Sequence, residues 1–389
     1  MDPFVADGAA EIASRSEREL EALVAVSSPS GDVDGAEEAI ALCAAFLPPQ
    51  ATVERVTSST SGSAPDMLAR IRGRGSGRVL LLGHVDTVIG HSSHAPLRRD
   101  GERLYGPGTV DMKGGDVLAL GVARALAPHP DAFDEVALLL VTDEEWRVEP
   151  FRHVERFASY DACLCFEGGQ LAADGEEGVV VQRKAAGTMR VAATGRASHS
   201  GSAPDQGRNA LLALAATAIG IAKLHDPGGA EHLSVVPTVV RSGDAFNVVP
   251  AGGELLFDMR ADRSESFGAV CAAVPGELDG VGLDVALQRV WPGMDSRDAT
   301  RGLLERAAAR LGRPISGVSR GGASDASHFA PSIPLTVDGL GPRGGAAHNP
   351  GEFVLAASFR QRAEVALALA AEVLGVGGAV GTSGPQTDS

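Results

Sequence analysis

The stretch Val79–Asp86 reads Val-Leu-Leu-Leu-Gly-His-Val-Asp, an apolar run of strand length that leads into a histidine and an aspartate. Two further apolar runs, Val136–Val141 and Ala162–Phe166, are each followed within a few residues by glutamate. Continuous apolar runs of this length are typical of strands buried on both faces of a sheet. Helical patterns such as Lys113–Leu126 alternate with these strands, and this alternation predicts an α/β sandwich.

The pattern changes after Gly187, where strands become half-exposed. The following segments predict the order strand–helix–strand–strand–helix–strand: Thr188–Thr194, Asn209–Lys223, Leu233–Arg241, Glu254–Arg260, Glu265–Val274 and Leu283–Val290. This order is that of a split, ferredoxin-like α+β unit. The helix Gly302–Leu311 then resumes the first pattern. We therefore predict a catalytic domain formed by residues 1–186 and 297–376, an inserted domain at 187–296, and a disordered tail at 377–389, which is rich in Gly, Ser and Thr.

Composition restricts the classes of partner. The chain has 389 residues, a length typical of two domains, and its 34 basic and 50 acidic residues give a formal net charge of −16. This balance argues against binding to nucleic acid or to an anionic membrane surface. Four cysteines are too few for a disulfide scaffold, and we read neither a signal peptide nor a membrane span, so we expect a cytoplasmic protein.

A histidine or a carboxylate follows the predicted strands and turns at five places. They are His84 with Asp86, Asp111 in a glycine-rich turn, the pair Glu144-Glu145, Glu167, and His348 in a second glycine-rich turn. Ligands of open α/β sheets collect at the carboxyl ends of strands, so these side chains are expected to meet. In an extended chain residues two apart face the same way, which lets Asp86 accept a hydrogen bond from the His84 imidazole and orient the ring.

Two histidines and several carboxylates are the mixture expected of a two-zinc hydrolytic site. In such a site a bridging carboxylate holds two metals, and water between them becomes a usable nucleophile near neutral pH. A further carboxylate must stay unligated as general base. Each feature alone has a plainer interpretation: a lone strand histidine is commonly structural, and adjacent glutamates at a strand end are commonly a solvated turn. The argument depends on all five occurring in this order.

These motifs resemble a known family. The resemblance rests on His84-Val85-Asp86, Gly108–Gly115, Glu144-Glu145, Glu167 and Gly195–Pro204. The family comprises zinc exopeptidases and N-acyl-amino-acid deacylases, including glutamate carboxypeptidase, acetylornithine deacetylase, succinyl-diaminopimelate desuccinylase and aminoacylase-1. The chain resembles glutamate carboxypeptidase most. The resemblance implies a mixed-sheet α/β/α catalytic domain with an inserted ferredoxin-like lid, which is also the dimerisation domain.

The resemblance also implies roles for single residues. Asp111 would bridge two Zn²⁺ ions (Co²⁺ and Mn²⁺ remain open), with Glu145 and His348 completing one site and His84 and Glu167 the other. Glu144 would be the general base, Asp86 would orient His84, and a cis peptide is expected at Asp111-Met112. His199 would reach the active site of the partner subunit in a homodimer and stabilise the oxyanion. Substrate contacts are implied for Asn247, Arg260, Gly321, Gly322 and Ala323.

The implied reaction is hydrolysis of the amide bond of an N-acyl amino acid or of a C-terminal residue in a short peptide. Glu at position 167 favours carboxypeptidases and deacylases over aminopeptidases, which commonly have Asp. Glutamate-selective members carry a basic residue near the last strand of the lid, and Val290–Met294 holds none. Trp291 either lines an apolar pocket or packs in the interior. A deacylase with another specificity is therefore the alternative to a glutamate carboxypeptidase.

Two other classes of function are weighed against this one. Gly317–Gly321 fits the Gly-x-Ser-x-Gly pattern of serine hydrolases, with Ser319 as nucleophile and Asp338 and His348 following in the required order. That motif needs a strand-to-helix turn at Ser319. The non-enzymatic alternative is a dimeric binding scaffold that retained the fold, which would be expected to have lost a ligand or the base.

Overall fold

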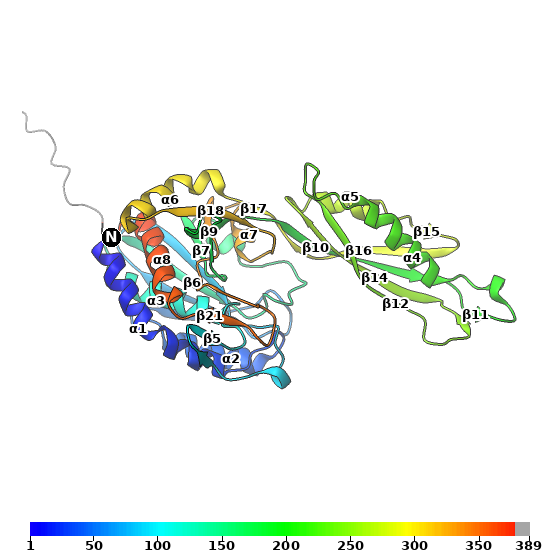
Figure 1. Ribbon diagram of the computed structural model, residues 1–389, viewed down its shortest axis with the longest axis horizontal. Helices are drawn as coiled ribbons and strands as arrows, with labels where there is room; N and C mark the ends of the chain where they lie inside the picture. The colour runs from blue at the N-terminus through cyan, green and yellow to red at the C-terminus, as the bar shows by residue number, and fades with distance from the viewer. Residues whose placement is uncertain (378–389) are drawn as a thin grey trace, which may run out of the picture.

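The computed structural model describes residues 1–377, so the predicted tail falls, from residue 378 onward, outside the described residues. Two packed units are joined side by side (Figure 1), and each has its own apolar core. The larger unit carries the helices α1 (Pro3–Ala25), α2 (Val33–Ala45), α3 (Lys113–Leu126), α6 (Arg297–Leu311), α7 (Ala326–Phe329) and α8 (Ser358–Leu374). Within this part of the chain, no helix is both long and apolar enough to cross a membrane.

A mixed six-stranded sheet forms the centre of the larger unit. Its strands are, in spatial order, β1 (Thr52–Val56), β2 (Asp66–Arg72), β6 (Phe133–Val141), β3 (Gly77–His84), β7 (Ala162–Cys165) and β19 (Leu335–Val337). β3 runs parallel to both β6 and β7, whereas β1–β2 and β2–β6 are antiparallel. The predicted mixed-sheet α/β architecture is therefore correct.

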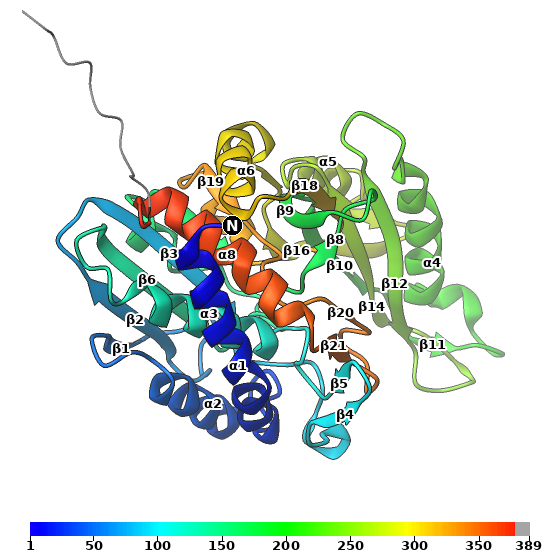
Figure 2. The same ribbon diagram turned by 60° about the vertical axis from the view of Figure 1, so that its left-hand side comes forward.

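Alternate residues of the central strands face two different cores. Leu81 and Leu138 lie in the core that includes α1, α3 and α8, whereas Leu80 and Leu139 face the core on the other side of the sheet, with Phe329. Figure 2 shows α1, α3 and α8 side by side over one face. Because side chains alternate across a strand, burial on both faces needs the continuous apolar runs seen in the sequence.

The first helix of the larger unit, α1, begins at Pro3, close to the start of the chain. The Asp2 side chain caps it by accepting a hydrogen bond from the Phe4 N–H, and proline is favourable in the first turn because it has no N–H to satisfy. Val5, Ala9 and Ile12 are buried at helical spacing, so the apolar periodicity agrees with a start at this cap.

Two smaller sheets complete the larger unit. One contains β8 (Gln170–Leu171), β9 (Glu177–Arg183), β17 (Met294–Asp295) and β18 (Ile315–Arg320). The other contains β4 (Arg98–Asp100), β5 (Arg103–Tyr105), β20 (Gly344–Gly345) and β21 (Phe353–Leu355). The second sheet brings the loop that carries His348 beside the loop that carries Asp111.

The smaller unit is an antiparallel sheet with helices on one face (Figure 1). Its strands are, in spatial order, β12 (Ser234–Ser242), β14 (Gly252–Ala261), β10 (Ala185–Thr194), β16 (Val281–Trp291) and β15 (Glu277–Leu278). Its helices are α4 (Ala210–Ile221) and α5 (Ser266–Ala272), and β11 (Ser198–His199) pairs with β13 (Val248–Val249) at the far end. The chain enters this unit where β9 passes into β10 and leaves it between β16 and β17.

Candidate metal centre

Three parallel strands deliver ligands to one edge of the central sheet. His84 is the last residue of β3, the Glu144-Glu145 pair follows β6, and Glu167 follows β7. Asp111 lies in the turn before α3, and its peptide bond to Met112 is cis, as the resemblance implied. His348 lies between β20 and β21. The structure thus brings together residues separated by more than 260 positions in the chain.

The side chains form two groups that share one aspartate. In the first group, His84 Nε2 lies 3.2 Å from Asp111 Oδ1 and 3.7 Å from Glu167 Oε1. In the second, His348 Nε2 lies 3.1 Å from Asp111 Oδ2 and 3.2 Å from Glu145 Oε2. Within each group the possible ligand atoms lie within 4.8 Å of one another. The two oxygens of Asp111 therefore face different groups, which is the arrangement of a bridging carboxylate.

The donor set fits divalent metal ions. Imidazole nitrogen and carboxylate oxygen are the ligands that zinc accepts beside cysteine. Buried Glu145 Oε1 has no hydrogen-bond partner among residues 1–377, although buried polar atoms are normally paired. A cation in the second group would satisfy it. The Asp111 carboxylate contacts His84 and His348, both members of the two groups.

Burial and close contact between charged groups shift the pKa values of several side chains of the site. Burial, reinforced by the charge of Asp111, raises the pKa of Glu167 to about 8. Burial also raises the pKa of Glu144 well above its ordinary value, with Asp325 and Glu167 adding to the effect. Hydrogen bonds to Asp111 and Glu145 raise the pKa of His348 to about 10. Carboxylates at this density need compensating positive charge, which a metal ion supplies.

Asp86 has a wider contact set than the sequence indicated. Its carboxylate accepts hydrogen bonds from the N–H groups of Glu144 and Glu145, both at 3.1 Å, and from Ser30 Oγ at 2.6 Å. His84 Nδ1 lies 3.0 Å from the main-chain oxygen of Asp86 and 3.4 Å from its Oδ1. The expected carboxylate–imidazole bond is thus the longer of two contacts. Asp86 therefore also holds the turn that presents the two glutamates.

Glu352 is a site residue that sequence reasoning missed. Its carboxylate accepts N–H bonds from Gly108, Val110 and Asp111, at 3.0, 2.8 and 3.0 Å. Burial raises its pKa to about 7. It stands more than 240 residues from the loop it holds and four after His348, and a single glutamate in a glycine-rich turn gives no sequence signal. The contact orients the loop that presents the shared aspartate.

We expect Glu352→Ala to weaken metal binding by about 10–100-fold, because groups that orient metal ligands typically contribute this much affinity. Competition with a metal chelator, followed by metal analysis, measures the change. Glu305→Ala, on the exposed face of α6, is the matched control and should bind metal as the wild type does. Equal metal affinity in both variants would show that the Asp111 loop needs no support from Glu352.

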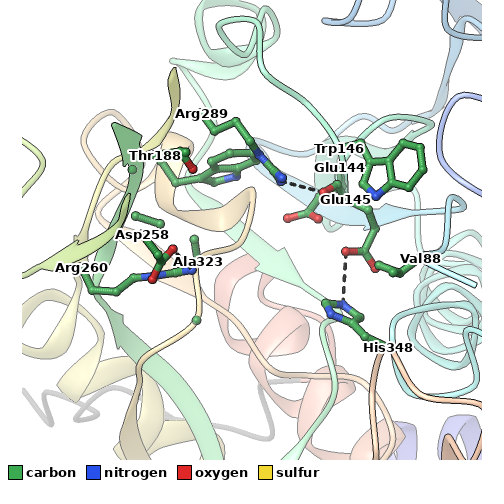
Figure 3. Close-up of a pocket in the computed structure, with 14 residues that line it drawn as sticks. Val88, Glu144, Glu145, Trp146, Thr188, Asp258, Arg260, Arg289, Ala323 and His348 are labelled. Carbon is green, nitrogen blue, oxygen red and sulfur yellow. Dashed lines mark hydrogen bonds and ion pairs between the residues drawn. The ribbon is translucent and has the colours of Figure 1, made fainter. Parts of the chain in front are cut away.

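A cavity of about 420 Å³ opens beside the ligands and is bordered by both units. Figure 3 shows Glu144, Glu145 and His348 on one side and Thr188, Asp258, Arg260 and Ala323 on the other. Of the predicted substrate-binding residues, Arg260, Gly322 and Ala323 line it, whereas Gly321 borders a neighbouring cavity. Asn247 and His199 are exposed in the smaller unit and do not line this cavity.

The cavity contains a basic residue that sequence analysis passed over. Arg289, one position before the segment Val290–Met294, lines it, and its Nη2 donates a hydrogen bond to the main-chain oxygen of Glu145 at 2.7 Å. Figure 3 shows Arg289 reaching toward the glutamate pair. Its backbone adopts φ 48°, an unusual value for a non-glycine residue. The regular alternation of a strand does not predict this local turn.

Trp291 is buried and also lines the cavity, so it both packs in the interior and borders the substrate space.

Arg147 forms a buried ion cluster beneath the glutamate pair. Arg147 is 1% exposed, and its Nη1 lies 3.3 Å from Asp143 Oδ1. Its Nη2 forms a second ion pair with Asp325. Its guanidinium lies 4.6 Å from the centre of the Phe151 ring. Buried charges are tolerated only when paired, so the cluster depends on the arginine.

We expect Arg147→Ala to lower the free energy of unfolding by about 3–5 kcal/mol, because removing one partner leaves buried charge uncompensated. Denaturant unfolding measures this value. Arg152→Ala is the control: its ion pair with Glu149, at 3.4 Å, is exposed, and such pairs contribute about 0–1 kcal/mol. A loss below 1 kcal/mol for Arg147→Ala would contradict the assigned burial of these charges.

The serine-hydrolase alternative is not supported by the local structure. Ser319 lies within strand β18 rather than at a strand-to-helix turn, and its Oγ donates a hydrogen bond to Gln182. Asp338 pairs with Arg183 and accepts from Ser324, while His348 contacts Asp111 and Glu145. The three residues of the supposed triad therefore have separate partners.

Comparison with known proteins agrees with this geometry. The model of the peptidase family M20/M25/M40 matches residues 80–372. The chain is 29% identical over 349 residues to carboxypeptidase G2 of Pseudomonas sp. (85% of this chain, 82% of that protein). It is 30% identical over 315 residues to succinyl-diaminopimelate desuccinylase of Stenotrophomonas maltophilia (74% and 82%).

Solved structures show the same fold over nearly the whole chain. The aminopeptidase PepT of Bacillus cereus superposes with a TM-score of 0.71 at 20% identity, covering 93% of this chain and 98% of that one. The M20 family metallo-carboxypeptidase Sso-CP2 of Sulfolobus solfataricus gives 0.70 at 15% identity, covering 92% and 98%. Together with the family match and the two ligand groups, these results show that the chain belongs to peptidase family M20/M25/M40 and is a metal-dependent hydrolase.

Proposed function

We propose that the protein is a di-zinc hydrolase of the glutamate carboxypeptidase type, which cleaves the amide bond before a C-terminal acidic residue or of the corresponding N-acyl amino acid. The observation that carries the proposal is the pair of ligand groups sharing Asp111, with Glu144 beside Glu145 at the edge of the cavity. The similarity to carboxypeptidase G2 over most of both chains supports it.

Five residues would hold the two ions: His84 and Glu167 in one group, Glu145 and His348 in the other, and Asp111 in both. The ions would supply Lewis acidity, which polarises an amide carbonyl and lowers the pKa of water toward neutrality. Cobalt and manganese accept similar donors and are alternatives to zinc. Retention of all five ligands and of Glu144 argues against the inactive binding scaffold.

Glu144 is the proposed general base. It lines the cavity, and its main-chain N–H is held by Asp86. Its neighbour Glu145 contacts His348, which leaves Glu144 as the carboxylate of the pair outside both ligand groups. In this position it would take a proton from attacking water and return it to the leaving amine.

Basic groups in the cavity support an anionic substrate. Arg260 lies across the cavity from His348, whereas Arg289 reaches toward the glutamate pair (Figure 3). Gly322 and Ala323 place main chain at the same cavity. Arg260 is held by Asp258 through two hydrogen bonds, at 3.0 and 2.9 Å, so its guanidinium is oriented. A substrate α-carboxylate and an acidic side chain would each find a basic partner.

A deacylase with non-glutamate specificity is the second candidate. Trp146 and Trp291 also line the cavity and offer apolar surface to an acyl group or side chain. The similarity to a desuccinylase agrees with this candidate. The two candidates differ in which side chains contact the amino-acid part of the substrate: the arginines in a glutamate carboxypeptidase, and the tryptophans in the deacylase.

The test is amine release from a panel of N-acyl amino acids and dipeptides with zinc added, varying the residue that carries the free carboxylate. We expect the highest kcat/KM for glutamate or aspartate, and Arg289→Met should remove that preference. A preference for apolar residues that Arg289→Met leaves unchanged would favour the deacylase. No hydrolysis across the panel by the zinc-loaded protein would contradict both candidates.

The smaller unit is proposed to form a homodimer. Helix α4 and the edge strand β12 both expose apolar side chains to solvent. They are Leu211, Leu212 and Ile219 on α4, and Val236 and Val240 on β12. An unpaired edge strand beside an exposed apolar helix favours pairing with a second copy. His199 and Asn247 lie exposed near the far end of the same unit, where a partner's active site could receive them.

We expect His199→Ala to lower kcat by about 10²-fold or more, the range for losing one oxyanion-stabilising donor. Steady-state kinetics measures the change. His225→Ala, which removes an exposed histidine of the same unit, is the control and should retain the wild-type rate. Wild-type turnover of the His199→Ala variant would mean that the partner's histidine does not enter the active site.

A further inference from the structure

A second polar cavity, of about 380 Å³, lies at the junction of the two units. We call it the junction cavity. Four basic side chains line it, together with one acidic side chain: Arg183, Lys184, Arg297 and Arg320, with Asp262. Of its lining residues, Gly321 is the one that the family resemblance implies as a substrate contact, and the main chain of Gly321 to Ala323 connects the junction cavity with the catalytic cavity.

Two of these basic groups are not neutralised by an acid. Lys184 Nζ donates a hydrogen bond to the main-chain oxygen of His232 at 2.9 Å, and Arg320 Nη1 donates to that of Gly168 at 2.7 Å. Over residues 1–377 neither cation has a carboxylate within 4 Å. Asp262, the acidic lining residue, is itself engaged by His232 Nδ1 at 2.8 Å. The junction cavity therefore carries an excess of positive charge.

Arg183 lies in the wall of the same cavity. It is buried, and its Nε donates to Asp338 Oδ2 at 2.5 Å while its Nη1 donates to the main-chain oxygen of Gly322 at 2.8 Å. Its Nη2 is buried and has no acceptor in the described part of the chain. Arg183 therefore belongs to the wall of the junction cavity, and the cations open to a ligand are Lys184 and Arg320.

The junction cavity is bordered by both units at the point where the chain crosses between them. Lys184 is the single residue between β9 and β10, and Arg297 starts α6 soon after the chain returns. His232 and Asp262 come from the smaller unit, and Arg320 ends β18 of the larger one. A ligand held by Lys184 and Arg320 would therefore touch both units and the loop leading to Gly322 and Ala323.

We propose that the junction cavity is an oxyanion-binding site, separate from the catalytic cavity, that takes a phosphate or carboxylate group of a small molecule through Lys184 and Arg320. Both sources offer the charged oxygens that lysine and arginine bind. A bound oxyanion contacts both units and so stabilises their relative position. None of its side chains belongs to the two ligand groups.

Calorimetric titration of the zinc-loaded protein with inorganic phosphate, at an ionic strength held constant with chloride, tests this proposal. We expect one saturable site per chain. The double variant Lys184→Met/Arg320→Met should bind about tenfold more weakly or worse, because it loses charge-assisted hydrogen bonds. Lys223→Met/Arg18→Met removes the same charge from exposed positions elsewhere and should bind as the wild type does.

Three outcomes would overturn the site. They are the absence of saturable binding of both phosphate and succinate to the wild type, equal weakening in the control variant, and unchanged affinity in Lys184→Met/Arg320→Met. The last outcome would place the anion at the catalytic metals instead. Repeating the titration with succinate distinguishes the two kinds of ligand. Tighter binding of succinate would identify a carboxylate as the ligand of the junction cavity, and tighter binding of phosphate would identify a phosphate group. The readout is binding, so it is independent of whether any tested amide is hydrolysed.

Discussion

Replacing Glu144 by alanine is expected to lower kcat by about 10²–10⁴-fold, the usual contribution of a positioned general base. Zinc content should not change, because Glu144 is in neither ligand group. The Glu144 side chain faces the cavity beside Glu145, where it can reach water and the leaving amine of a substrate (Figure 3). Steady-state kinetics together with metal analysis of the same sample measures both properties.

Glu155→Ala is the matched control, since Glu155 is an exposed glutamate ten residues away from the ligand Glu145. It should retain the wild-type rate and metal content. Full turnover by Glu144→Ala would remove the base from the proposed mechanism. Loss of zinc from this variant would instead make Glu144 a ligand, and the assignment of the glutamate pair would then be reversed.

Asp111→Ala is expected to lose metal from both groups and to lower kcat/KM by about 10³-fold or more, because metal ions contribute several kcal/mol to stabilising the transition state. Asp111 Oδ1 and Oδ2 contact different histidines, at 3.2 and 3.1 Å, so one substitution affects both groups. The loss should exceed that of any substitution confined to one group. Metal analysis after gel filtration and kinetics with added zinc measure the effect.

The control is Asp7→Ala, which removes an exposed carboxylate from α1 and should keep two ions. Removing metal from the wild type with a chelator should abolish activity, and zinc should restore it. An Asp111→Ala variant that still holds two ions at wild-type affinity would show that this carboxylate does not bridge them.

Much of the ligand set was predictable because it depends on local order. A histidine that ends a buried strand and glutamates that follow the next strands must reach one edge of the sheet when those strands are parallel. β3, β6 and β7 are parallel neighbours, and His84, Glu145 and Glu167 each lie at the carboxyl end of one of them, within one of the two groups that share Asp111. The apolar runs also predicted the mixed α/β sheet, because burial on both faces requires them.

Other residues could not be found this way, because their roles depend on long-range contacts. Glu352 holds the Asp111 loop from more than 240 positions away, and only the pairing of β21 with β5 brings them together. Arg289 reaches the cavity through a local backbone turn inside a strand whose residues otherwise alternate.

The sequence by itself determined the class of the fold and the residue types that gather at the candidate metal centre. Both depend on which residues follow one another along a strand, and strand periodicity is a local property. The tertiary structure decided which oxygen of Asp111 faces which histidine, which groups orient the ligands, and that Lys184 and Arg320 meet at the junction cavity. These depend on distances between segments far apart in the chain, which only the packing of sheets and loops determines.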